Sequence, residues 1–383
     1  MTTPVYYSMP GSYDPEPLRQ GLQEILEPLL KEKGGISGKK ILLKPNLLFC
    51  RYPDDPAAVN PALIVAVAEF LVKAGASVTI LENPGTQNVS TILSKMGIAE
   101  KLEALQIPFA DFADYRPKQL PEACKFRQLT MAREFENFDL VLDLAKAKTH
   151  AMMTLTLAIK NLFGLIGSAD RIAWHLAVGS DFSRFADLLV DLYLTVKPGI
   201  NIIDGVISME GNGPGSGTPV SSGFLAASSD ALALDASVSK VLGVKEEKLP
   251  ILIQARKRGL DLAFEDHGSR PELPPCKLPD PPGMLNAWGV TLPPFFKKQL
   301  RNLVGSRPLL TRELCISCGR CAEVCPPRSL KMKLKEERKL PSFDLNNCIR
   351  CYCCQEHCPK GAIKTQPQIL TALVSRIAKL VRH

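Results

Sequence analysis

The chain has 383 residues, of which 45% are hydrophobic and 22% are charged, and its formal net charge is +8. This length and balance are typical of a globular protein with two or three domains. The N-terminus has no basic start followed by an apolar stretch, which argues against a signal peptide. The longest apolar runs, 61–72 and 152–167, contain Glu69 and Lys160 respectively and do not have the character of membrane spans. We therefore expect a cytoplasmic protein.

Residues 1–270 alternate helix-like and strand-like patterns. A helical stripe of apolar residues occupies 18–30, where Pro28 should bend the helix, and a buried strand follows and ends at Pro45. We further predict helices at 61–76, 183–199 and 230–243, and strands at 77–85, 138–148, 200–210 and 223–229. Strands rich in Val, Ile and Leu that alternate with helices favour an α/β fold with a mostly parallel sheet covered by helices.

The composition changes after residue 270. Eight prolines between 271 and 294 predict a stiff linker, and a short basic amphipathic segment completes the region 271–305. A cysteine-rich domain follows at 306–366. The tail at 367–383 has the pattern of a basic amphipathic helix. We expect this helix to pack on its own protein, with peripheral membrane contact as the less favoured alternative.

The positive charge belongs to the C-terminal region. Residues 297–383 contain 18 Lys and Arg but 6 Asp and Glu, a net charge of +12, so the preceding residues sum to −4. No nucleic-acid-binding motif accompanies this charge, and we expect no nucleic-acid partner. The charge is either solvated surface or a docking face, whose partner is an acidic electron carrier such as a ferredoxin or a flavodoxin, or an anionic membrane.

Nine of the twelve cysteines fall within 315–358. Clustered cysteines in a cytosolic chain indicate metal binding rather than disulfides. Two runs, starting at Cys315 and Cys348, share the spacing C-x2-C-x2-C-x3-C-P. In bacterial ferredoxins, three cysteines of such a run bind one [4Fe–4S] cluster and the fourth binds the other cluster. The spacing therefore predicts two [4Fe–4S] clusters.

The crosswise rule assigns four cysteines to each cluster. The first cysteine set is Cys315, Cys318, Cys321 and Cys358, and the second cysteine set is Cys348, Cys351, Cys354 and Cys325. Cys353 is out of register, and we expect a packing residue or an S–H donor there. Structural zinc is the alternative, although it must account for a third cysteine and a C-P ending in both runs. The segment between the runs predicts a hairpin, and this whole region resembles the dicluster ferredoxins, which implies a small α+β domain.

Polar side chains gather where the predicted strands of the large domain end. Because ligands of parallel α/β sheets bind outside the carboxyl ends of the strands, these side chains should form one cationic crevice for an anionic small molecule. The predicted substrate-binding residues are Lys44, Asn46, Lys146, Lys148, His150, Lys160 and Asn161. The candidates for catalysis are His150, Asp204 and Glu210. The glycine-rich stretch 211–219 does not match a dinucleotide-binding motif, and we expect a substrate-covering loop or a plain turn.

Several of these blocks occur together in a known family. The stretches "LLKPNLL", "ENPG", "KAKTHAMMTLTLAIKNLFGLIG", "DGVISMEGNGPGSG" and "CIRCYCCQEHCP" resemble domain of unknown function 362 in the form fused to a dicluster ferredoxin. The resemblance implies the two-part architecture and the clusters, and leaves the reaction open. We predict an iron–sulfur oxidoreductase. The alternatives are a non-catalytic electron carrier or adaptor within a larger complex, and a scaffold whose clusters sense redox state.

Overall fold

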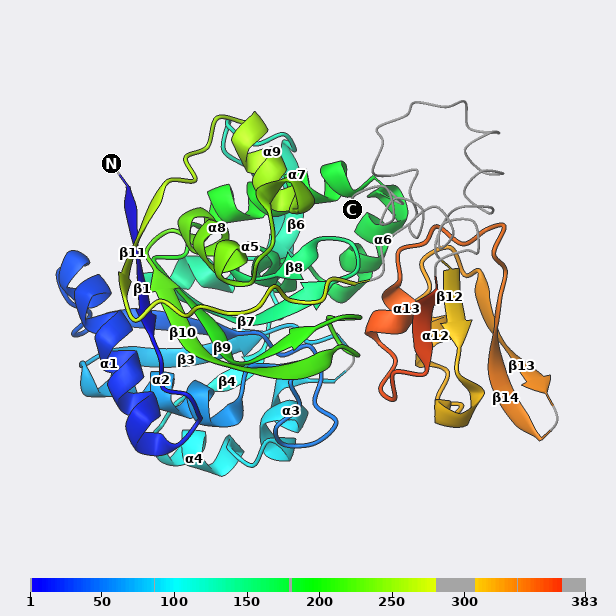
Figure 1. Cartoon of the computed structure of the whole chain (residues 1–383), viewed down its shortest axis with the longest axis horizontal. Helices are drawn as coiled ribbons and strands as arrows, with labels where there is room; N and C mark the ends of the chain where they lie inside the picture. The colour runs from blue at the N-terminus through cyan, green and yellow to red at the C-terminus, as the bar shows by residue number, and fades with distance from the viewer. Residues whose placement is uncertain (1, 86, 179–180, 280–306, 336, 367–383) are drawn as a thin grey trace.

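The computed structural model describes residues 2–366 except 86, 179–180, 280–306 and 336. In this part of the chain a large sheet carries helices on both faces, and a smaller unit built from 307–366 lies beside one end of the sheet (Figure 1). Of the predicted linker, 271–279 is described and contains neither helix nor strand. The predicted amphipathic segments before 306 and at 367–383 lie outside the described residues.

Nine strands of the described chain form the large sheet, in the order β11-β1-β10-β9-β7-β2-β3-β4, with β8 paired to β7. These strands are β1 (Thr3–Ser8), β2 (Lys40–Pro45), β3 (Ser77–Glu82), β4 (Phe109–Asp111), β7 (Leu140–His150), β8 (Thr154–Thr156), β9 (Ile200–Glu210), β10 (Thr218–Ser228) and β11 (Phe264–Gly268). Strands β9, β7, β2, β3 and β4 are parallel to one another, and β1 is parallel to β11. Only β10 and β8 pair antiparallel within the described sheet. The predicted mostly parallel α/β sheet is confirmed.

Each face of the sheet buries its own hydrophobic cluster, as expected for strands covered on both sides. One face is covered by α1 (Pro15–Glu32), α2 (Pro61–Lys73), α3 (Val89–Lys95) and α4 (Ala99–Ala104). The other is covered by α5 (Ala158–Asn161), α6 (Ser168–Val178), α7 (Phe182–Val196), α8 (Ala231–Val241) and α9 (Pro250–Lys257). A separate hairpin consists of β5 (Tyr115–Gln119) and β6 (Gln128–Ala132).

Local sequence signals set the ends of the helices. The side chain of Asn60 accepts a hydrogen bond from the backbone N–H of Ala62 at 2.9 Å, and Pro61 occupies the first helical position of α2. The helix ends shortly before Gly75, whose φ of 86° lies in the left-handed region that favours glycine. Helix α1 continues through Pro28 to Glu32.

The parallel strands bring the predicted site to one edge of the sheet. Strands β2, β3, β7 and β9 are parallel neighbours, so their carboxyl ends lie at the same edge. The glycine-rich stretch 211–217 connects β9 to the antiparallel β10 as a hairpin turn at this edge. The small domain lies against the same edge (Figure 1).

The small domain consists of two short antiparallel strand pairs and two short helices. Its elements are β12 (Arg307–Leu310), β13 (Leu330–Lys335), β14 (Arg338–Phe343), β15 (Ile363–Gln366), α12 (Arg320–Glu323) and α13 (Cys353–Glu356). Strands β13 and β14 form the hairpin predicted between the two cysteine runs. Among the described residues, none of the helices has the length and apolar character needed to cross a bilayer.

Candidate functional site

The structure gathers the cysteines of the small domain into two groups. One cavity is lined by Cys315, Cys318, Cys321 and Cys358. A second cavity is lined by Cys325, Cys348, Cys351 and Cys354. These are the first and second cysteine sets, each with its fourth member from the other run. Four thiol groups around a cavity suit a [4Fe–4S] cluster, which takes one thiolate on each iron.

The two cysteine loops repeat the same backbone geometry. Ser317 in the first run and Arg350 in the second have φ values of 59° and 60°. The residue after the second cysteine is also left-handed in both runs, Gly319 at 79° and Tyr352 at 58°. Glycine takes this conformation freely, whereas a tyrosine adopts it against a steric penalty. The turn that directs three cysteines towards one cavity is therefore kept in the second run without the glycine.

Cys353 lines neither cysteine cavity. Its thiol is buried and hydrogen-bonded to Cys351, a contact that lowers the pKa of Cys351. This placement agrees with the expected S–H donor. Cys353 opens helix α13, whose Gln355 and Glu356 contact the large domain.

A polar cavity of about 80 Å³ lies where the carboxyl ends of the strands meet the small domain. We call it the cationic cavity. It contains five of the seven predicted substrate-binding residues, namely Asn46, Lys148, His150, Lys160 and Asn161. Its other polar side chains are Glu82, Asn83, Thr156, Arg171 and Glu356.

Buried hydrogen bonds fix one wall of the cationic cavity. Lys148 Nζ donates to Asn46 Oδ1 at 2.8 Å, and Asn46 Nδ2 donates to Asn161 Oδ1 at 2.8 Å. Asn161 Nδ2 in turn donates to Asp143 Oδ1 at 2.8 Å. Burial lowers the pKa of Lys148 to about 7 and raises that of Asp143 to about 7. This series of hydrogen bonds links residues far apart in sequence and holds their side chains in one orientation.

Lys160 carries a positive charge that forms no ion pair with the described residues. Its Nζ lies 4.7 Å from the ring centroid of Phe163 and 5.6 Å from that of Phe185. No hydrogen bond or ion pair joins Nζ to another of the described residues, and burial lowers its pKa to about 8. Arg171 adds a second cation, which donates to Pro84 O and Ser168 Oγ. Both cations remain available to an anion in the cavity.

His150 and Glu356 meet across the boundary between the two domains. His150 Nδ1 accepts hydrogen bonds from the backbone N–H groups of Met152 at 3.0 Å and Met153 at 3.3 Å. The proton of the neutral imidazole is therefore assigned to Nε2, which lies 3.4 Å from Glu356 Oε1. Burial, followed by the charge of Lys160, lowers the pKa of His150 well below its usual value, so the ring is neutral.

Glu356 belongs to α13, and its side chain is buried within the cationic cavity. Its Oε1 makes no hydrogen bond to a described residue. Burial raises the pKa of the carboxyl to about 7, against the charges of Lys160 and Lys148.

The turn 211–217 makes room for α13. A Cβ atom on Gly215 would lie 2.8 Å from Glu356 O and 2.8 Å from the ring of Phe49. One on Gly85 would lie 3.0 Å from His357 Nε2. Side chains at these glycines would displace α13 from the large domain. The predicted loop or turn is thus a contact surface for the small domain.

Two predicted substrate-binding residues do not line the cationic cavity. Lys44 Nζ donates to Glu82 Oε2 at 2.5 Å, and both side chains are almost fully buried. Lys146 faces Asp204 in the register of β7 and β9, and its Nζ donates to Asp204 Oδ2 at 2.8 Å. Both lysines are neutralised by buried carboxylates and hold neighbouring strands together.

Of the three catalytic candidates, His150 is the one that lines the cavity. Asp204 accepts hydrogen bonds from Lys146 and from Tyr13 Oη at 2.7 Å. Glu210 accepts a hydrogen bond from the backbone N–H of Lys277 at 2.9 Å. Both carboxylates are occupied by structural contacts.

Two charged residues of the cationic cavity, Arg171 and Glu356, are not predicted by the sequence. Arg171 lies in an amphipathic helix where no spacing distinguishes it from a solvated arginine. Glu356 lies inside a cysteine run whose spacing was informative only about metal ligands. The feature of the sequence that could have indicated a functional role for Glu356 was its position between Cys354 and Cys358, which belong to the two cysteine sets.

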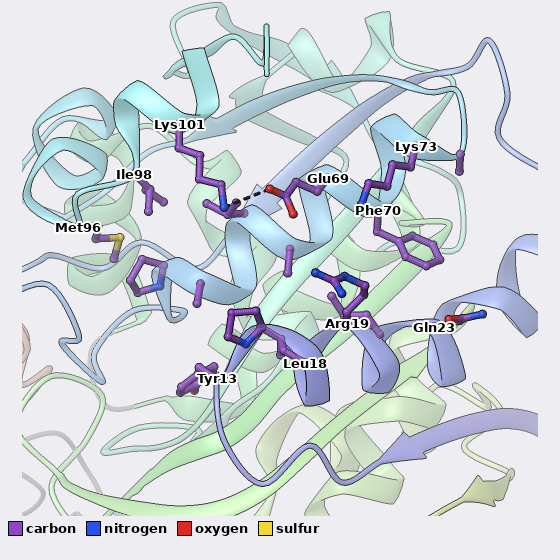
Figure 2. A pocket seen from close by; sticks show the side chains of 17 residues that line it. Tyr13, Leu18, Arg19, Gln23, Glu69, Phe70, Lys73, Met96, Ile98 and Lys101 are labelled. Carbon is purple, nitrogen blue, oxygen red and sulfur yellow. Dashed lines mark ion pairs between the residues drawn. The ribbon is translucent and has the colours of Figure 1, made fainter. Parts of the chain in front are cut away.

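A larger cavity of about 540 Å³ lies away from this chemistry, between α1 and α2 (Figure 2). Its walls are mostly apolar, including Leu18, Val65 and Phe70, with Lys73 and the ion pair of Lys101 and Glu69 at its rim. None of the cysteines or predicted site residues lines it. Volume therefore does not identify the functional site here.

The comparisons with known proteins agree with this division. Residues 41–240 match the family model described as Domain of unknown function (DUF362), and residues 314–362 match the model described as 4Fe-4S dicluster domain. A thylakoid-associated protein of Synechocystis sp. is 32% identical over 255 residues, which are 65% of this chain and 78% of that protein. The small domain is an iron–sulfur domain of the electron-transfer type.

Among solved structures, the lactate racemase apoprotein from Thermoanaerobacterium thermosaccharolyticum is similar over 55% of this chain, with 13% identity and a TM-score of 0.35. The chain spans about half of that protein, 51% of its length.

Proposed function

We propose that this chain, which belongs to the DUF362 family, binds two [4Fe–4S] clusters and exchanges electrons with a compact anion in the cationic cavity. The predicted family resemblance is confirmed by the match over 41–240. The proposed activity is that of an iron–sulfur oxidoreductase.

The observation that carries this proposal is the position of helix α13. The helix begins at Cys353, contains Cys354 of the second cysteine set, and ends at Glu356 inside the cationic cavity. Cys358 of the first set follows two residues later. An electron carrier that served only other proteins would have no need for a polar ligand cavity completed by its cluster-binding loop.

The residues of the cavity support an anionic ligand. Lys148, Lys160 and Arg171 offer positive charge, and Asn46 and Asn161 hold Lys148 in place. The volume of about 80 Å³ suits an anion of a few non-hydrogen atoms. His150, with its proton on Nε2, can donate a hydrogen bond to the ligand or transfer a proton to it.

A [4Fe–4S] cluster supplies one-electron transfer to whatever is bound beside it. In the direction of reduction, the anion gains two electrons and two protons. The electrons come from an external one-electron carrier protein, and the protons come from water. The reverse direction releases the same electrons and protons.

Reoxidation of the reduced protein tests the proposal. Protein purified without air is reduced with dithionite, freed of excess reductant and mixed with a panel of small carboxylates and phosphates while the visible absorbance of the clusters is followed. We expect one class of anion to accelerate reoxidation, and Lys160→Met to abolish the acceleration. Lys31→Met, an exposed lysine on α1, is the matched control. If no anion binds or reoxidises the protein, the proposed oxidoreductase activity is wrong. Copurification of a redox enzyme with the chain in stoichiometric amount would then favour the adaptor alternative.

A further inference from the structure

The small domain has a surface at the first cysteine set where Leu314, Ile316 and Cys318 are exposed in the described structure. We infer that this surface, formed by Leu314, Ile316, Cys318, Leu334 and Lys360, docks an acidic one-electron carrier protein. The inference rests on the proposed function, since it concerns the source of the electrons. Electrons enter or leave the molecule at this surface.

Exposed apolar side chains mark the surface. Six large hydrophobic residues of the described chain are exposed, and four of them lie in the small domain. Ile316 and Leu314 are 56% and 44% exposed and line the cavity of the first cysteine set. Leu334 is 71% exposed. Apolar side chains gathered around one site, rather than scattered singly, indicate a protein-binding surface.

Strand geometry places Leu334 with the others. Met332 and Leu334 are two residues apart on β13, so their side chains point to the same face of the hairpin. Met332 lines the first cysteine cavity together with Leu314. The apolar surface therefore continues from the first cysteine loop along the hairpin.

The cysteine exposure agrees with this assignment. Among the cysteines, Cys318 alone is exposed in the described structure, and it lies between Ile316 and Gly319 in the first loop. Cys351 of the second set is buried, as are Cys321 and Cys358 of the first set. Figure 1 shows α13 on the side of the small domain that faces the large sheet, and the β13–β14 hairpin on the far side. Cys318 is thus the most accessible of the predicted cluster ligands, and the first cysteine set presents it to an external protein.

The charge around the surface is positive. Lys360 is exposed and lines the cavity of the first cysteine set. Arg338 Nη1 and Nη2 donate to the carbonyl oxygens of Cys315 and Arg312, each at 3.4 Å, which keeps the guanidinium at this loop. Glu313 is the acidic residue of the same loop. Over residues 307–366 there are 12 Lys and Arg and 6 Asp and Glu.

An apolar centre with a cationic rim selects the partner by its chemistry. A complementary protein has carboxylates around an apolar patch that exposes its own redox group. An anionic membrane could also use positive charge, but it does not require an apolar centre beside an exposed cluster ligand. The observations therefore favour a protein carrier.

Binding of an acidic bacterial flavodoxin to the cluster-loaded full chain tests the inference. We expect calorimetry to show binding at an ionic strength of about 0.01 M that weakens at about 0.15 M. Ile316→Ser and Lys360→Glu should each weaken binding on the order of tenfold. Lys31→Glu, an equal charge change on α1, should leave binding within about twofold. Iron content and the electron paramagnetic resonance signal of each variant show that the clusters are intact.

Three results would overturn the inference. These are unchanged binding by Ile316→Ser and Lys360→Glu with intact clusters, equal weakening by Lys31→Glu, and binding to phosphatidylglycerol vesicles without binding to flavodoxin. Chemically reduced protein needs no carrier for the reoxidation assay. Anion-dependent reoxidation without flavodoxin binding would therefore refute the docking surface and leave the proposed function standing.

Discussion

Lys44 and Lys160 lie at the same edge of the sheet but differ in what surrounds them. Lys44 forms a buried ion pair with Glu82, whereas no carboxylate oxygen of the described residues lies within ion-pair distance of Lys160 Nζ. Replacing each with methionine keeps the length of the side chain and removes the charge. We expect the two substitutions to change stability in opposite directions.

The Lys44→Met variant leaves Glu82 buried without its counterion. Removal of one partner of a buried pair costs about 3–5 kcal/mol, so we expect the free energy of unfolding to fall by about that amount.

For Lys160, burial lowers the pKa from 10.5 to about 8. At pH 7, below both values, the ammonium is charged in the folded and unfolded states, and the shift corresponds to a folding penalty of up to about 3 kcal/mol. Lys160 is only partly shielded from solvent, and its contacts with Phe163 and Phe185 offset about 0.5–1 kcal/mol. We therefore expect Lys160→Met to raise the free energy of unfolding by about 1–2 kcal/mol.

The same variant should bind anions less well. Loss of a cation beside the ligand removes about 2 kcal/mol or more, which weakens binding on the order of thirtyfold. Urea unfolding of the cluster-loaded protein gives the stabilities, and calorimetry with inorganic phosphate as a probe gives the affinities. If Lys160→Met destabilises the protein as Lys44→Met does, Lys160 has a structural partner and the description of the cavity is wrong.

Three further predictions follow from the same geometry. Anion affinity, measured by calorimetry, should fall as pH rises from about 7 to about 9. Lys148 and Lys160, with pKa values of about 7 and about 8, lose their protons over this range, and the Glu356 carboxyl, with a pKa of about 7, gains negative charge. A flat profile would refute this. Gly215→Ala should weaken anion binding by displacing α13. Gly167→Ala is the control and should leave binding unchanged, because its Cβ would lie at an ordinary contact distance of 3.4 Å from the ring of Tyr115. Equal effects of the two variants would contradict the contact between Gly215 and α13. The Cys353→Ser variant should retain the iron and sulfide content of the natural protein, and loss of one cluster would make Cys353 a ligand.

Features with a local or periodic cause were predictable from the order of the amino acids. The alternation of Val, Ile and Leu strands with helices specified the mostly parallel sheet, because burial on both faces requires continuous apolar strands. The cysteine spacing specified the two sets, because a thiolate can reach a cluster only from certain positions in a tight loop. Lys148 and His150 were predictable from their place at the end of β7.

Which charges form ion pairs depends on the packing of the folded chain. Lys146 and Lys148 are two residues apart on one strand, yet Lys146 is neutralised because Asp204 of β9 stands opposite it. Arg171 and Glu356 reach the cationic cavity from a distant helix and from the small domain. Pairing across strands and packing between domains depend on contacts between residues far apart in sequence, which no local spacing encodes.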